Sequence, residues 1–216
     1  MGKLYPESRV EIEGILAKHY GFLLNLVTAG RYKHFIQKAV EDMKIRPSDK
    51  ILDLGAGSGY NAEFMCKYMG KEGYILGLEI GETAIRRFNN RFEGIDKVQI
   101  EKRRIDKPIP YENVFDKVFA SFVFHGLPHS SRLKLLDNAH NALKKNGTLL
   151  ILDYGKFEVA TLPFYFKIPF KALECKYAFD YLKRDWDNIF RQHRFEVTGR
   201  NTYFNNFAQL LSARKV

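Results

Sequence analysis

The feature that most limits what this chain can fold into is a glycine-rich segment at a predicted junction between a strand and a helix. An apolar run over residues 51–54 is followed by Gly55, Gly57 and Gly59, and a helical pattern begins near Asn61. Glycine lets the backbone turn sharply and approach a ligand where a Cβ atom would collide. The segment therefore predicts a ligand-binding turn, although a glycine-rich turn without a ligand has the same local pattern.

The spacing of the glycines argues against two common phosphate-binding loops. A dinucleotide-binding turn reads G-x-G-x-x-G, whereas the third glycine here comes one place earlier and Tyr60 occupies the dinucleotide position. A P-loop needs Gly-Lys-Ser or Gly-Lys-Thr, and neither follows. The loop is therefore of a third kind.

Strand and helix patterns alternate through the middle of the chain. Short apolar strands are expected at 50–54, 73–80, 97–102, 115–122 and 148–153. Helices are expected at 61–69, 82–92 and 131–144. Such alternation predicts right-handed strand–helix–strand units and a mainly parallel α/β sheet.

The C-terminal part differs from this alternation. Two strand-like runs, 195–203 and 207–213, are separated by three residues. So short a connection makes an antiparallel hairpin, because a parallel crossover needs a dozen residues or more. We expect one domain over residues 1–216, with a helical cap at 1–46, a Rossmann-like core at 47–216 and a lid insert at 155–192.

An acidic residue ends the second predicted strand. Glu79 follows the apolar run 75–78 and lies at the strand edge where α/β proteins bind ligands. Its carboxylate could accept hydrogen bonds from both hydroxyls of a ribose. An exposed carboxylate at a strand end is the alternative, and the neighbouring glycine loop favours the ligand role.

With Asp53 before the three glycines, the chain resembles the class I methyltransferases that depend on S-adenosylmethionine (SAM), whose first motif is an acidic residue followed by G-x-G-x-G. The segments 115–118 and 143–149 resemble the same family's "F-D-x-V" and "L-K-x-G-G" motifs. Residues 19–31 resemble the N-terminal stretch of the ubiquinone/menaquinone-biosynthesis C-methyltransferases and related small-molecule or phospholipid methyltransferases. The resemblance implies a seven-stranded mixed sheet, SAM as cofactor and methyl transfer as the activity.

The resemblance also implies a set of cofactor-binding residues, namely Tyr20, Asp53, Gly55, Ala56, Gly57, Gly59, Glu79, Ile80, Ile105, Asp106 and Ser121. Tyr20 would cover the SAM pocket, or else be a core aromatic residue. The family's usual adenine-binding acid falls near Arg104 in this chain, so Asp106 or a backbone amide would take its place and Ile105 would pack on the adenine. A solvated basic turn is the alternative for this stretch.

The chain departs from the quinone enzymes after the fourth predicted strand. Those enzymes usually carry Arg-Asn there, whereas this chain has His125. A histidine at the ligand-binding edge could remove a proton from a phenol, a hydroxyl or a ring carbon during methyl transfer. It could equally shape the pocket through hydrogen bonds. We therefore expect His125 at the acceptor side of the site.

The charge and the composition of the chain indicate which kinds of partner it could bind. The formal net charge of +10 favours an anionic partner such as an acidic lipid surface, a nucleic acid or an acidic substrate. Aromatic residues alternate with lysines over 161–171, which suits a lipidic or flat acceptor or a lid. No nucleic-acid-binding signature accompanies them, so nucleic acid is the weaker expectation.

The remaining sequence features suggest a cytoplasmic protein. The N-terminus lacks a signal-peptide pattern, and no apolar run reaches membrane-spanning length. The two cysteines do not have metal-ligand spacing, so no metal is expected. RNA or protein methylation, or SAM binding without turnover, are the alternative functions, and the oligomeric state is not defined by the sequence.

Overall fold

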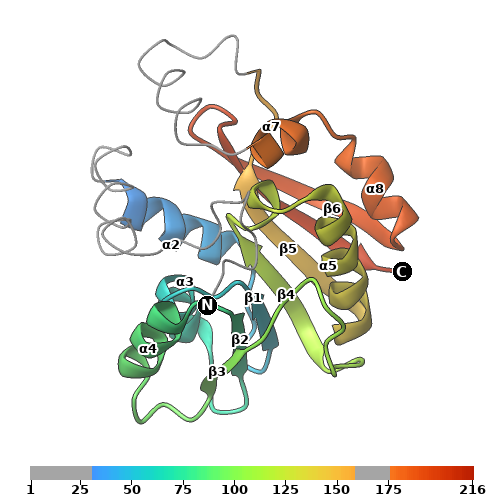
Figure 1. Ribbon diagram of the computed structural model, residues 1–216. Helices are drawn as coiled ribbons and strands as arrows, with labels where there is room; N and C mark the ends of the chain where they lie inside the picture. The colour runs from blue at the N-terminus through green and yellow to red at the C-terminus, as the bar shows by residue number, and fades with distance from the viewer. Residues whose placement is uncertain (1–30, 159–175) are drawn as a thin grey trace.

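The computed structural model describes residues 31–158 and 176–216 (Figure 1). Tyr20, the first part of the expected cap and residues 159–175 of the expected lid lie outside the described residues. No helix in the two described ranges is long and apolar enough to cross a membrane.

A seven-stranded sheet with the order β3-β2-β1-β4-β5-β7-β6 forms the centre of the fold. Its strands are β1 (Lys50–Leu54), β2 (Tyr74–Glu79), β3 (Val98–Lys102), β4 (Phe115–Ser121), β5 (Leu143–Tyr154), β6 (Phe195–Tyr203) and β7 (Ala208–Lys215). All pairings from β3 to β5 are parallel, and β7 pairs antiparallel with both β5 and β6. The predicted mixed sheet with a C-terminal antiparallel hairpin is confirmed.

Helices cover both faces of the sheet (Figure 1). They are α2 (Tyr32–Asp42), α3 (Tyr60–Met65), α4 (Glu82–Arg91), α5 (His129–Ala142), α7 (Lys176–Leu182) and α8 (Trp186–Gln192), with short 3₁₀ turns η1 (Cys66–Tyr68) and η2 (Phe124–Gly126). Buried side chains of α2, α3 and α4 share one apolar cluster, and those of α5, α7 and α8 share the other. The sheet is thus buried on both faces, which explains its continuous apolar strands.

The boundary between the third predicted helix and the fifth predicted strand was wrong. The sequence placed this helix at 131–144 and the strand at 148–153, but α5 ends at Ala142 and β5 already begins at Leu143. Leu143 is fully buried and pairs with Phe115, and the register then shifts so that Thr148 pairs with Lys117. Residues 143–147, which the sequence divided between the helix and a connection, therefore belong to β5, because the strand pairing buries Leu143.

The parallel arrangement brings the carboxyl ends of β1, β2, β4 and β5 to one edge of the sheet. In open α/β sheets this edge is where ligands bind. Glu79 ends β2 at this edge, and the glycine loop and the turn that carries His125 follow β1 and β4 there.

Candidate active site

The glycine loop connects β1 to α3 through three residues with left-handed backbone conformation. Gly55, Gly57 and Gly59 have φ angles of +79°, +56° and +78°. A Cβ atom on Gly55 would lie 2.7 Å from Val123, and one on Gly59 would lie 2.5 Å from Phe92. Packing and backbone conformation therefore both require glycine at these two positions.

Gly57 differs, because a Cβ atom there would meet no atom of the described residues within 4 Å. Protein packing consequently does not explain this glycine, although its positive φ does. The open space beside Gly57 lies where the family resemblance places the cofactor. Close packing thus explains Gly55 and Gly59, whereas the space beside Gly57 is open.

Glu79 lies beside this loop, as the sequence predicted. Its Oε2 atom accepts a hydrogen bond of 2.9 Å from the amide of Gly57, and its Oε1 atom accepts bonds from the amides of Ile80 and Gly81. The amides of Gly55 and Ala56 both donate to the carbonyl of Leu78, which fixes the loop against the end of β2. A carboxylate has about four acceptor sites, so Glu79 can also accept hydrogen bonds from the hydroxyls of a ligand.

Asp53 is the least usual residue of the site. Its side chain is 1% exposed, and neither carboxylate oxygen has a hydrogen-bond partner among the described residues. Burial, reinforced by the nearby charge of Glu79, raises the pKa of Asp53 to about 7. Buried carboxylates are normally paired, so the unpaired carboxylate of Asp53 beside the glycine loop suits a cationic or hydrogen-bonding ligand.

The stretch predicted to contact adenine follows β3. Ile105 is buried and packs in the core, and the Asp106 side chain is 7% exposed. Arg104 donates to both oxygens of Asp106, at 2.9 and 2.8 Å, and Ser131 donates at 3.2 Å. The acid is therefore held in a bidentate ion pair, and an adenine contact through Asp106 stays a prediction.

The turn that carries His125 packs directly on the glycine loop. β4 ends at Ser121, which is half-buried, and Phe122 then adopts a φ of +53° with its amide donating 2.7 Å to the carbonyl of Leu152. A bulky residue rarely adopts this conformation, and such strain gathers at functional sites. Val123 lies against Gly55, so η2 is a direct neighbour of the loop.

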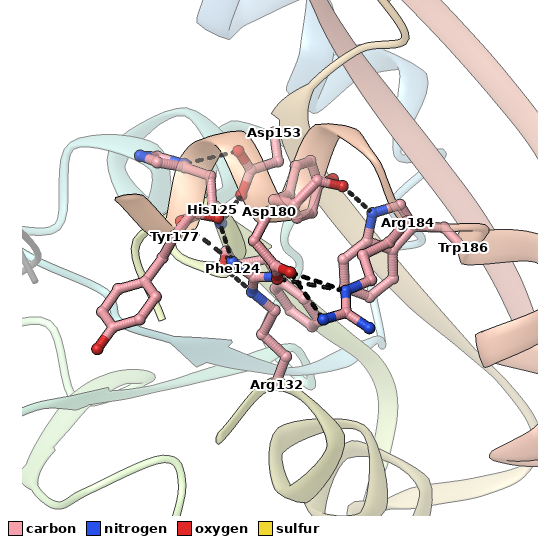
Figure 2. A network of polar contacts seen from close by, with 9 residues as sticks. Phe124, His125, Arg132, Asp153, Tyr177, Asp180, Arg184 and Trp186 are labelled. Atoms are coloured by element: carbon pink, nitrogen blue, oxygen red, sulfur yellow. Dashed lines mark hydrogen bonds and ion pairs between the residues drawn. The ribbon is translucent and has the colours of Figure 1, made fainter. Parts of the chain in front are cut away.

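His125 contacts a buried acid that sequence reasoning did not identify. The Nδ1 atom of His125 lies 2.7 Å from Oδ1 of Asp153, whose side chain is 0% exposed (Figure 2). The amide of His125 donates to the other oxygen at 3.2 Å, and the amide of Tyr154 donates to Oδ1 at 2.8 Å. The sequence could have pointed to Asp153 through its position, because it is an acidic residue near the end of the fifth strand, at the edge of the sheet that carries His125.

Arg132 was also missed. Its side chain is 0% exposed, and its Nε atom donates 2.7 Å to the carbonyl of Phe124 within η2. Its guanidinium also binds the carbonyl of Tyr177 at 2.5 Å and the carboxylate of Asp180 at 2.7 Å, both on α7 (Figure 2). Arg132 therefore joins the His125 turn to α7, a helix within the expected lid insert. Its position on a helix of mixed composition gave no signal of this role.

Aromatic side chains surround the imidazole of His125. The ring centroid of Tyr154 lies 4.6 Å away and that of Phe122 lies 6.3 Å away. Phe157 and Phe207 stack on each other at 4.9 Å and both contact Tyr154. The side of the site that holds His125 is thus aromatic, whereas the side that holds Asp53 and Glu79 is acidic.

Comparison with known proteins assigns this fold and loop to a family. The family described as "Methyltransferase domain" matches residues 45–194, most of the chain, and the chain therefore belongs to it. A methyltransferase from Aquifex aeolicus described as SAM-dependent shares the fold, with a TM-score of 0.68 at 19% identity over 93% of this chain and 98% of that chain.

Two curated relatives add more specific likenesses. The ubiquinone/menaquinone biosynthesis C-methyltransferase of Coxiella burnetii is 25% identical over 178 residues, which are 80% of this chain and 66% of the relative. The phosphoethanolamine N-methyltransferase of Plasmodium falciparum is 28% identical over 143 residues, which are 66% of this chain and 52% of the relative. The chain thus spans about two thirds of the first relative and about half of the second. It is a class I SAM-dependent methyltransferase, and its cofactor is SAM.

The residues at the sheet edge fit this cofactor. SAM carries a positively charged sulfonium and an ammonium group, and the unpaired carboxylate of Asp53 offers a charge of opposite sign. Glu79 is fixed at the end of β2, where it can accept hydrogen bonds from the two ribose hydroxyls. The open face at Gly57 leaves room for a ligand to reach the loop backbone.

Proposed function

We propose that this chain transfers the methyl group of SAM to a small or lipidic acceptor bound beside His125. The observation that carries the proposal is the aromatic surrounding of His125, at the same edge as the glycine loop. Flat rings and acyl chains are bound by such apolar surfaces, and a few polar groups then fix their orientation. The relatives that act in quinone biosynthesis and on phosphoethanolamine support a small acceptor.

Methyl transfer asks the protein mainly for positioning. SAM supplies, when bound, an electrophilic methyl group on a positively charged sulfur. Glu79 and Asp53 would hold the ribose and the cationic part, and the glycine loop would bring the backbone close to the cofactor. Holding donor and acceptor in line can provide most of the acceleration, because it removes the entropy cost of their encounter. His125 would receive a proton from the acceptor as the new bond forms.

The test is release of S-adenosylhomocysteine in the presence of a panel of quinols, phenols and phospholipids. We expect turnover with at least one of these and none with an RNA or protein panel. Calorimetric SAM binding without turnover on any panel would instead make the chain a SAM-binding module. Turnover restricted to RNA, with affinity that falls steeply as salt rises, would assign the activity to nucleic acid.

A further inference from the structure

We propose that Asp153 is the positioning residue that makes His125 a proton acceptor, and that the matching acceptor is an aromatic hydroxyl un-ionised at neutral pH. This inference rests on the proposed methyl transfer to a small acceptor. It is argued from two sets of contacts. Asp153 accepts hydrogen bonds from the ring of His125 and from two backbone amides, and the imidazole packs against aromatic side chains.

The contacts of Asp153 determine which nitrogen of His125 carries the proton. A carboxylate only accepts hydrogen bonds, so the contact of 2.7 Å requires Nδ1 of the neutral ring to be the donor. The lone pair is then on Nε2, the nitrogen on the far side of the ring from Asp153 (Figure 2). Because Asp153 also accepts from the amides of His125 and Tyr154, its carboxylate cannot rotate without losing these bonds.

The backbone that carries His125 is fixed from the other side. Arg132 holds the carbonyl of Phe124 at 2.7 Å and lies 3.4 Å from the carbonyl of His125. Its own side chain is anchored by Asp180 on α7. The ring and the backbone of His125 are therefore each held by a buried charged group, which is the arrangement expected where a side chain must keep one orientation.

A second histidine–aspartate pair in the chain shows what an ordinary pair looks like. His193 and Asp137 have the same contact of 2.7 Å between Nδ1 and Oδ1. The Asp137 side chain is 57% exposed, whereas that of Asp153 is 0% exposed. The two pairs share their geometry but differ in burial, so the surface pair is a matched control for the site pair.

The chemistry that this arrangement suits is removal of a hydroxyl proton. The acceptor oxygen bonds to the methyl carbon, and the carbon–sulfur bond breaks with its electron pair remaining on sulfur. The hydroxyl proton goes to Nε2 of His125, and the resulting imidazolium is stabilised by the carboxylate of Asp153. The rings of Tyr154 and Phe122 offer faces and edges for packing the aromatic part of the acceptor. Acceptors that are already ionised do not need this step.

The first test reads the tautomer of His125 directly, without turnover. In ¹⁵N-imidazole NMR of the wild-type chain, we expect the neutral ring of His125 to carry its proton on Nδ1. Asp153→Asn should change the tautomer population, because the amide can also donate, whereas Asp137→Asn should leave His125 unchanged. A wild-type ring with its proton on Nε2 would overturn the proposal, whether or not the variant folds.

The second test separates positioning from general stability by using two acceptors. With 4-methylphenol, which is un-ionised at neutral pH, Asp153→Asn should lower kcat at least tenfold, up to the ~10²–10⁴-fold that a general base contributes. KM should stay within about twofold. With 2-chloro-4-nitrophenol, which is ionised at neutral pH, the loss should largely disappear. Equal losses with both phenols would show that Asp153 only supports the structure.

A double variant tests whether Asp153 acts through His125. If Asp153 acts through His125, then His125→Asn combined with Asp153→Asn should be no slower than His125→Asn alone. Additive losses would refute the coupling. If the wild-type chain binds SAM but methylates no phenol, the aromatic-hydroxyl part fails, while the NMR result still decides the role of Asp153.

Discussion

Replacement of Asp53 by asparagine tests whether the buried carboxylate is kept for a ligand. The side chain is 1% exposed, and its pKa is raised to about 7 by burial and by the charge of Glu79. The folded chain therefore holds a proton on Asp53 that the unfolded chain has already released above pH 3.8. Stability conferred by this proton is complete below pH 3.8 and is lost as the pH rises through 7.

The size of the effect follows from the pKa. At about 1.4 kcal/mol per pH unit, ionised Asp53 destabilises the SAM-free folded chain by about 4 kcal/mol. An asparagine does not titrate, and its unpaired buried amide costs about as much as the unpaired protonated carboxyl that it replaces, about 1–3 kcal/mol in either case. At pH 8 we therefore expect Asp53→Asn to be more stable than the wild type by up to about 4 kcal/mol. Its stability should also depend less on pH between 4 and 7.

The assay is urea denaturation of the SAM-free protein from pH 4.5 to 8.5, with SAM affinity measured in parallel. Asp49→Asn is the control, because Asp49 is equally buried but is bonded to Lys117 at 3.1 Å and to Arg46. Breaking this buried pair should destabilise by about 3–5 kcal/mol. Asp53→Asn should bind SAM more weakly above pH 7. The same stability-versus-pH curve for wild type and Asp53→Asn would refute the reasoning.

Three further predictions concern the cofactor and the surface. Gly57→Val should abolish SAM binding in calorimetry, because a side chain would enter the open face; unchanged affinity would contradict the loop assignment. Glu79→Ala should weaken SAM binding by about 1.5–3 kcal/mol for each lost charge-assisted bond; a change below twofold would count against a ribose contact. The net charge of +10 should favour anionic over neutral vesicles in co-sedimentation; salt-sensitive RNA binding without vesicle binding would reverse this order.

The placement of the glycine loop beside Glu79 could be predicted from the sequence because it depends on local order along the chain. The strand run, the spacing of Gly55, Gly57 and Gly59 and the acid at the end of the next strand are all close in sequence. Parallel strands then bring these segments to one edge without further information. The C-terminal hairpin was predictable for the same reason, since its short connection permits one geometry.

Contacts between distant segments were decided by the tertiary structure alone. Asp153 meets His125 because β4 and β5 are neighbours in parallel register, and Arg132 meets Asp180 because α5 and α7 cover the same face of the sheet. The sequence next to Asp53 does not show that its carboxylate lacks partners, because this depends on the donors of every segment packed against it. Sequence order thus determined which loop we expect to bind the cofactor, whereas packing decided which buried charges are paired.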